Sequence, residues 1–458
     1  MRIFAALALC LALAACSGEK TASPSTDNTA DSAPETAAVD GGAEAIDQND
    51  DPASGDDLDK IAEDFVKLAL AAGVHDAAFV DAYNGPEEWA EAAKTEARSL
   101  EDLEQDAQAL LIRASRANAD TGSVRSSMLE KQTRAALARI QMVRGDTFPF
   151  DEETRLLYDV VAPQYDVSEF HNAISEINDL LPGDAPLHER VDAFRSSLAI
   201  PEDKLQAVFE AAIAECRRRT LEHYDLPEDE TFRLEFVTDQ PWSGYNWYQG
   251  GHESLIQVNT DFPIMIDRAV DLGCHEGYPG HHTWNVFIER DLLGEKGWIE
   301  YSIYPLFSPM SVTAEGSANY GIELTFPGAE KIAFERDVLF PLAGLDPADA
   351  GKLEALNEAS SKLSHARNHI ARAYLDEKVD REEAIRMTME FGLQSRERAE
   401  QGVRFVETYR GYVLNYNIGR DIVADYVARK ADGGMDRWEA FETLLTTPLS
   451  ASDIQSAK

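Results

Sequence analysis

The sequence predicts a mainly α-helical fold with one small β-sheet near its middle. Apolar residues recur at intervals of three and four along most of the chain, and this spacing places them on one face of a helix. Alternating patterns typical of strands are confined to residues 232–259. The apolar fraction of 44% is enough for a sizeable core, so the chain is predicted to be a folded helical protein of 458 residues.

The N-terminus resembles a secretion signal. Residues 3–15 form an apolar run that is too short to span a bilayer as a mature helix. Small residues precede Cys16, which resembles a bacterial lipobox and predicts a signal peptide over 1–15, cleavage before Cys16 and lipidation of that cysteine. An ordinary secretory signal that contains a cysteine is the alternative. Ser17 after the cysteine favours the outer membrane, with the protein facing the periplasm.

Residues 16–57 are predicted to form a disordered acidic tether. Residues 17–60 contain twelve Asp or Glu against two Lys and almost no large apolar side chain, so they cannot bury enough surface to become ordered. The net charge of the whole chain is −41, which argues against binding to nucleic acid. It also opposes attraction to anionic lipids, so we expect membrane attachment through the lipid anchor only.

A helical N-terminal part is predicted over residues 58–228. Leu103, Ala107 and Leu110 illustrate the spacing of one apolar helix face. These helices are interpreted as scaffold, and they are expected at 58–73, 76–82, 86–119, 125–144, 151–161, 168–181, 186–199 and 201–224.

The remaining part, residues 229–458, contains the predicted sheet and the side chains that could bind a metal ion or take part in catalysis. Residues 232–237 alternate like a strand, and 245–249 and 254–259 flank Gly250-Gly251 as a β-hairpin would. A helix is expected from Pro263 into the following histidine-rich stretch. Further helices are expected at 328–339, 346–374, 380–391 and 393–415.

Three histidines and one glutamate lie within the eight residues His275-Glu276-Gly277-Tyr278-Pro279-Gly280-His281-His282. This pattern begins like the zinc-hydrolase motif H-E-x-x-H, but proline occupies the position of the second histidine. Proline interrupts the helix and glycine permits an unusual turn, which could bring His281 back toward His275. We therefore predict His275 and His281 as ligands of Zn²⁺ and Glu276 as the general base. His282 is an alternative second ligand, or it supports the site or contacts substrate.

Glu315 is the best candidate for a third ligand. It lies among small and apolar residues, which predicts a buried carboxylate that needs a partner. Asn319 follows one helical turn later, where its carbonyl could accept a hydrogen bond from a ligand histidine. The alternative is that these residues form a structural or vestigial polar cluster.

At these motifs the sequence resembles the bacterial domain-of-unknown-function 885 family. The resemblance rests on H-E-x-x-P-G-H-H and on E-G-x-A-x-Y, and it covers about residues 230–430. The family is similar to the gluzincin metallopeptidases, and many of its members are predicted lipoproteins. The resemblance implies a gluzincin-like helical fold with the small sheet beside the active-site helix, and zinc held by two histidines and a glutamate.

A third segment, residues 410–419, is similar to the family pattern P-G-Q-A-L-x-Y-x-x-G. The match implies that Tyr416 binds the substrate carbonyl or the developing oxyanion. Arg410 and Tyr412 replace the usual Pro and Gln, and Ser317 replaces a usual Trp. These departures leave the predicted metal ligands intact and concern substrate preference.

The predicted function is zinc-dependent hydrolysis of oligopeptides in the cell envelope. Tyr245, Trp247 and Arg410 are candidate substrate-binding residues, and an extended peptide could add to the small sheet. The alternatives are a metal-dependent hydrolase of a non-peptide envelope compound and a non-catalytic binding lipoprotein. Pairing of Cys216 with Cys274 is as plausible as two buried thiols, and the sequence leaves the oligomeric state open.

Overall fold

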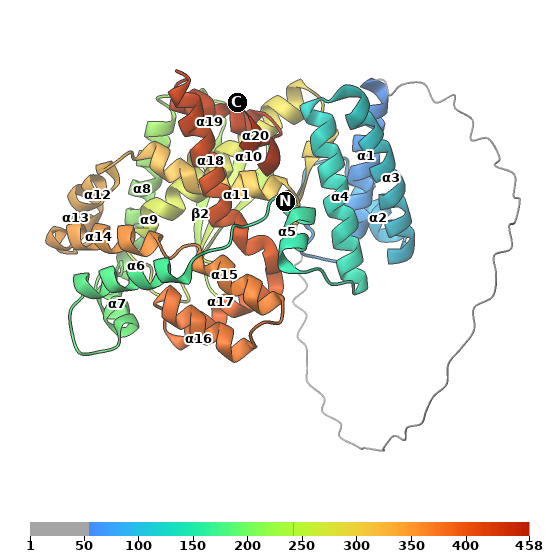
Figure 1. Ribbon diagram of the computed structural model, residues 1–458. Coiled ribbons are helices and arrows are strands. Elements are labelled where there is room, and N and C mark those ends of the chain that lie inside the picture. Colours follow the sequence, from blue (N-terminus) through green and yellow to red (C-terminus); the bar gives the residue numbers. More distant parts are fainter. Residues whose placement is uncertain (1–54, 241, 458) are drawn as a thin grey trace, which may run out of the picture. The chain divides into compact units, whose positions relative to one another are not determined.

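The computed structural model describes residues 55–240 and 242–457 (Figure 1). Within them the predicted fold class is confirmed, because helices dominate and the strands form one three-stranded and one two-stranded sheet. The predicted signal peptide, Cys16 and nearly all of the tether lie outside the described residues. No helix among the described residues has both the length and the apolar character required to cross a membrane.

Eight helices lie within residues 55–220. Serine side chains begin two of them, since Ser99 accepts a hydrogen bond from the Asp102 N–H and Ser123 from the Ser126 N–H. Leu103, Phe65 and Ile61 are fully buried where the first, third and fourth helices pack together. The bounds are α1 Gly55–Gly73, α2 Glu87–Thr95, α3 Leu100–Thr121, α4 Val124–Arg144, α5 Phe150–Tyr158, α6 Val167–Leu180, α7 Leu187–Ser196 and α8 Leu205–Thr220, with a 3₁₀ turn η1 at Glu202–Lys204.

Two predictions in this part are wrong. The expected helix at 76–82 is in fact partly a strand, β1 (Val80–Tyr83), which pairs antiparallel with β5 (Ile303–Pro305). The strand forms because β5, more than 200 residues away, pairs with it, and the local sequence pattern carries no information about that partner. The expected helix at 86–119 is two helices, because Ser99 caps a new helix after α2 has ended.

The three-stranded sheet contains β2 (Thr231–Val237), β3 (Gly244–Gly250) and β4 (Glu253–Asn259) in the order β2-β4-β3. The predicted hairpin is confirmed, since β3 pairs antiparallel with β4, with Trp247 opposite Leu255. Gly250 and Gly251 have φ values of 75° and 61°, which suit glycine in a tight turn. β2 pairs with β4 in parallel, and Val258 and Ile256 are buried.

The central helices follow this sheet. α9 (Arg268–Leu272) continues into a π-helical turn, η2 (Gly273–Gly277), and then α10 (His281–Phe287) and a second π-helical segment, η3 (Ile288–Glu295). η4 (Ile299–Ser302) precedes β5, and α11 (Met310–Thr325) lies beside the later helix α18 (Leu414–Asp432). Cys216 and Cys274 form a disulfide that joins α8 to η2, so the structure resolves a pairing that the sequence left open.

Helices complete the chain after α11. The expected helix at 393–415 is interrupted, because Arg410 has a φ of 50° and ends α17. The segments are α12 Glu330–Phe334, η5 Glu335–Leu339, α13 Phe340–Ala343, η6 Pro347–Asp349, α14 Ala350–Ser361, α15 Ala366–Leu375, α16 Arg381–Gly392, α17 Arg396–Tyr409, η7 Arg410–Val413, α18, α19 Arg437–Thr446 and α20 Ala451–Ser456.

Candidate metal centre

Two imidazoles and one carboxylate converge between η2, α10 and α11. The candidate ligand atoms of His275, His281 and Glu315 all lie within 4.8 Å of one another. Glu315 Oε2 is 3.4 Å from His275 Nε2 and 3.8 Å from His281 Nε2. Two ligands of one tetrahedral zinc ion lie about 3.3 Å apart when each bond is about 2.0 Å long. The three side chains therefore have the spacing that a shared ion requires.

The donor set also fits a cation because one of its atoms lacks a partner. Glu315 Oε2 is buried and has no hydrogen-bond partner. A buried carboxylate oxygen without a partner is costly, and a metal ion is a usual reason for one. Two neutral imidazoles and a carboxylate match the ligands found in catalytic zinc sites, which keep a fourth position open.

Gly280 makes the return of the chain to the site possible. Its N–H donates to the Cys274 carbonyl at 3.0 Å, which folds the segment back over η2. A Cβ atom at position 280 would lie 1.8 Å from the His275 carbonyl oxygen, so only glycine fits. The His281 ring then stands edge-to-face against His275, with 4.7 Å between the ring centroids.

Tyr412 holds the other oxygen of the candidate carboxylate ligand. Its hydroxyl donates to Glu315 Oε1 at 2.7 Å, and both side chains are buried. In the sequence, Tyr412 stands out only as a departure from the family pattern, and the pattern predicts no role for it. Its position offered a clue, because tyrosine and the usual glutamine can both donate a hydrogen bond.

The charges at the triad favour a neutral His281 and an ionised Glu315. Burial lowers the pKa of His281 to about 4, and the charge of His275 acts in the same direction. Burial raises the pKa of Glu315, but the nearby His275 and His281 outweigh burial and lower it. Burial lowers the pKa of His275, but the nearby carboxylates of Glu315 and Glu276 outweigh burial and raise it. A metal ion would compete with the proton on His275.

Glu276 lies next to this cluster on η2. Burial raises the pKa of its carboxyl to about 7, and the charge of Glu315 adds to the shift while His275 opposes it. A carboxyl with a pKa near neutrality can both accept and return a proton. Gly244 on β3 makes room for it, since a Cβ at this position would lie 3.1 Å from Glu276 Oε1. Asn246 donates to the Glu276 carbonyl at 2.6 Å, so the sheet also fixes the backbone here.

His282 points away from the triad into a separate buried network. Its Nδ1 lies 2.8 Å from Ser254 Oγ, and its Nε2 lies 3.0 Å from Glu230 Oε2. Glu230 also accepts hydrogen bonds from Tyr278 and Arg217. The structure thus places His281, and not His282, beside Glu315. His282 joins the metal-site segment to β4 and to the residue before β2.

The structure gives Asn319 a contact different from the expected one. Its amide nitrogen donates to the Tyr416 carbonyl at 3.0 Å, which links α11 to α18. Tyr416 itself is half-buried; burial raises its pKa, and the charges of Glu315 and Glu276 raise it further while Arg367 opposes them. Its hydroxyl therefore lies within the electrostatic range of the candidate site.

The three candidate substrate-binding residues lie in different surroundings. The Tyr245 hydroxyl donates a hydrogen bond to Asp81 on β1. The ring of Tyr245 packs against the exposed Trp247, with 4.5 Å between the ring centroids. Arg410 forms an ion pair with the buried Glu153, with 2.7 Å between Arg410 Nε and Glu153 Oε2. The Gly411 N–H donates a hydrogen bond to the other oxygen of the same carboxylate. Since its guanidinium is held by Glu153, Arg410 supports the η7 turn that carries Tyr412.

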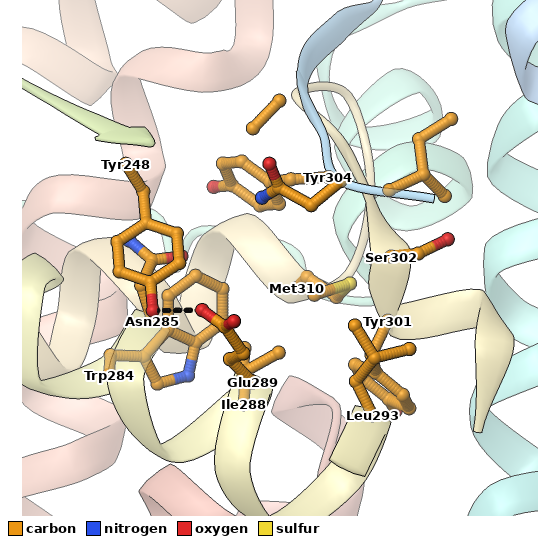
Figure 2. Close-up of a pocket in the computed structure, with 13 residues that line it drawn as sticks. Tyr248, Trp284, Asn285, Ile288, Glu289, Leu293, Tyr301, Ser302, Tyr304 and Met310 are labelled. Atoms are coloured by element: carbon orange, nitrogen blue, oxygen red, sulfur yellow. Dashed lines mark hydrogen bonds between the residues drawn. The ribbon is translucent and has the colours of Figure 1, made fainter. Parts of the chain in front are cut away.

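A small cavity has a volume of about 30 Å³, and none of the three candidate ligands lines it. Figure 2 shows the residues that line this cavity. Tyr248 donates its hydroxyl to Glu289 at its edge, and Tyr304 lies on its wall. A space of this size holds a water molecule rather than a peptide. Its walls come from β1, β3, α10, η3, η4, β5 and α11.

Comparisons with known proteins support the fold. No protein-family model and no curated protein matches the chain. A crystal structure of a predicted lipoprotein from Colwellia psychrerythraea superposes with a TM-score of 0.52 at 15% identity, covering 86% of this chain and 68% of that chain. The fold of this chain therefore occurs in a solved structure.

Two further solved structures are similar over most of their length. A predicted lipoprotein of unknown function from Shewanella oneidensis has a TM-score of 0.46 at 14% identity, covering 80% of this chain and 75% of that chain. An M32 carboxypeptidase from Deinococcus radiodurans R1 has a TM-score of 0.38 at 13% identity, covering 85% and 90%. Both likenesses are distant.

Proposed function

We propose that this protein is a zinc-dependent metallopeptidase that hydrolyses oligopeptides in the cell envelope. The observation that carries the proposal is the meeting of His275, His281 and Glu315 around one position, with the free oxygen of Glu315 facing both imidazoles. Glu276 adds a buried carboxyl with a pKa of about 7 beside these ligands. This combination is the one that metal-assisted hydrolysis requires.

In the proposed reaction Glu276 transfers protons and Tyr416 stabilises the developing negative charge. When bound, zinc would act as a Lewis acid and lower the pKa of a water molecule. Glu276 takes a proton from the water that attacks the peptide carbonyl carbon. The Tyr416 hydroxyl donates to the oxygen that gains negative charge. As the C–N bond breaks, Glu276 returns the proton to the leaving amine.

Two further features support an envelope peptidase. The motifs around His275 and Glu315 support membership of the domain-of-unknown-function 885 family and its likeness to gluzincins. The predicted lipobox at Cys16 supports a lipid-anchored protein on the outer membrane, and the Colwellia relative is itself a predicted lipoprotein. In this proposal residues 1–15 are the signal peptide, 16–57 the tether, 58–228 the helical scaffold and 229–458 the catalytic part.

The test measures metal content together with peptide cleavage. The wild-type protein should bind one zinc ion and cleave a mixed peptide library, and a chelator should abolish cleavage until zinc is restored. His275→Ala should lose both metal and cleavage, whereas His171→Ala, which removes an exposed histidine, should lose neither. Glu276→Gln should keep the metal and lose about 10²–10⁴-fold in kcat. Absence of stoichiometric metal, or unchanged turnover in Glu276→Gln, would contradict the proposal.

A further inference from the structure

Glu153 is a buried carboxylate on α5, a helix that the sequence predicts as scaffold. Its side chain is 0% exposed, and a charge at this depth is costly unless strong partners compensate for the lost hydration. The partners lie 257 and 258 residues further along the chain. Glu153 Oε2 pairs with Arg410 Nε at 2.7 Å, and Oε1 accepts the Gly411 N–H at 2.9 Å. Both oxygens of Glu153 therefore hold the η7 turn.

The η7 turn begins with a backbone conformation that has to be held in place. Arg410 has a φ of 50° and a ψ of −124°, a combination that glycine adopts readily and other residues rarely enter. Gly411 packs closely against α5, because a Cβ atom there would lie 2.8 Å from Thr154 Cγ2 and 3.1 Å from Glu153 Oε1. A strained conformation persists only where the surrounding structure fixes it. Glu153 provides two of the bonds that fix this one.

The same turn carries Tyr412 to the candidate metal centre. Tyr412 follows Arg410 by two residues, and its hydroxyl donates to Glu315 Oε1 at 2.7 Å. Tyr158, which shares α5 with Glu153, packs edge-to-face against Tyr412 with 6.1 Å between the ring centroids. Thus α5 fixes the backbone that precedes Tyr412 and also contacts its ring.

Another buried ion pair of this chain offers a comparison. Glu300 is 1% exposed and accepts hydrogen bonds from Arg125 at 2.7 and 3.0 Å, one to each carboxylate oxygen. This pair joins η4 to α4. Glu300 therefore has the burial and the charge of Glu153, but its two oxygens hold a different part of the chain.

We propose that Glu153 is a positioning residue of the candidate metal centre. It holds the η7 turn so that the Tyr412 hydroxyl reaches Glu315. The inference rests on the proposed function, because it assumes that Glu315 binds zinc. Glu153 acts through Tyr412 and takes no part in the transfer of protons.

The test is a double-mutant cycle on zinc affinity. Chelator competition measures the affinity in the wild-type protein, Glu153→Gln, Tyr412→Phe and the variant that combines both changes. Glutamine keeps the volume of residue 153 and removes the charge that pairs with Arg410. Glu300→Gln is the matched control, because it removes an equally buried charge. Urea unfolding verifies that each variant is folded and measures its free energy of unfolding.

Glu153→Gln should lower zinc affinity about 10-fold, as expected when a group that supports a metal ligand is lost. In the Tyr412→Phe protein the same change should alter the affinity by less than about twofold, because effects that pass through one hydrogen bond do not add. Glu300→Gln should lose stability and still bind zinc like the wild-type protein.

Position 410 gives a second comparison. Arg410→Gly and Arg410→Ala both remove the ion pair with Glu153, but only glycine accepts a φ of 50° without strain. Arg410→Ala should therefore lower zinc affinity more than Arg410→Gly.

Hydrogen exchange provides a readout that needs no metal. In metal-free protein, mass spectrometry should detect faster exchange of residues 409–413 in Glu153→Gln than in the wild-type protein. The reason is that the Gly411 N–H loses its charged acceptor.

Additive losses in the double-mutant cycle, an equal loss of affinity in Glu300→Gln, or no loss in Glu153→Gln would overturn the inference. The failure of the proposed function has a different signature, because zinc would then bind with the expected dependence on Glu153 while no peptide is cleaved. A wild-type protein that binds no zinc would overturn both.

Discussion

Glu315 is positioned from two sides. One oxygen faces the His275 and His281 imidazoles, and the other accepts the Tyr412 hydroxyl at 2.7 Å. Groups that hold a ligand carboxylate orient it and tune its affinity for the metal. Tyr412 therefore acts through Glu315, although it lies 97 residues away in the chain.

Replacing Tyr412 with Phe should weaken zinc binding. The change keeps the ring in the core and leaves Glu315 Oε1 without its donor, so we expect zinc affinity to fall about 10–100-fold. Chelator competition measures the affinity. Tyr374→Phe, which removes a hydroxyl that donates to Glu407, is the matched control. Unchanged affinity would mean that α11 and the imidazoles position Glu315 without help.

Glu230 makes the buried His282 network sensitive to acid. Burial raises the pKa of Glu230, but hydrogen bonds from His282, Tyr278 and Arg217 outweigh it and lower the pKa to about 2, from 4.5. Because the folded value is depressed, the stabilisation is fully present above about pH 4.5 and is lost as pH falls through about 2.

Glu230→Gln should therefore reduce the free energy of unfolding at neutral pH and flatten its decline between pH 4.5 and 2. Urea unfolding at several pH values measures both effects. Glu235→Gln on the exposed side of β2 controls for loss of a charge. A variant with the same pH slope as the wild-type protein would show that Glu230 does not contribute this stabilisation.

Close approach of α11 and α18 brings Glu315 and Tyr416 into one region. A Cβ on Gly316 would lie 2.4 Å from the Gly419 carbonyl carbon, and a Cβ on Gly419 would lie 2.5 Å from the Val312 carbonyl oxygen. Only glycine at both positions allows the two backbones to approach this closely. The neighbouring residues Glu315 and Asn319 then reach residues of η7 and α18.

Gly419→Ala should push these helices apart. We expect a loss of about 1–3 kcal/mol in the free energy of unfolding from overpacking, together with weaker zinc binding because Glu315 shifts. Denaturant unfolding and chelator competition measure the two effects. Gly351→Ala on α14 is the matched control, since a Cβ there meets open space and alanine favours the helix. Equal behaviour of the two variants would contradict this account.

The whole molecule carries strong like-charge repulsion. Its net charge is −41, from 83 acidic and 42 basic residues. Such an excess destabilises the compact state by self-repulsion, and salt reduces the repulsion by shortening the range of the charges.

Sodium chloride should therefore stabilise this protein. Raising its concentration from about 0.02 M to about 0.5 M shortens the Debye length from about 20 Å to about 4 Å, so we expect the unfolding temperature to rise by several degrees. Differential scanning calorimetry measures it. Sucrose at equal osmolality separates screening from a general solute effect. An unfolding temperature that stays constant or falls with salt would contradict the expectation.

The sequence by itself determined features that depend on near neighbours. Helical spacing of apolar residues predicted most helices, and Gly250-Gly251 between two alternating segments predicted the β3–β4 hairpin, because both patterns report local backbone geometry. The chemical types and spacing of residues 275–282 indicated a metal site for the same reason. Strand β1 and the break at Arg410 were missed, because distant partners decide them.

Only the tertiary structure decided which residues meet across long separations. It placed His281 rather than His282 beside Glu315, paired Cys216 with Cys274, and brought Tyr412 to the carboxylate. It also paired Arg410 with Glu153. The physical reason is that hydrogen bonds and ion pairs are governed by distances in the folded chain, and sequence spacing does not report those distances between separate helices.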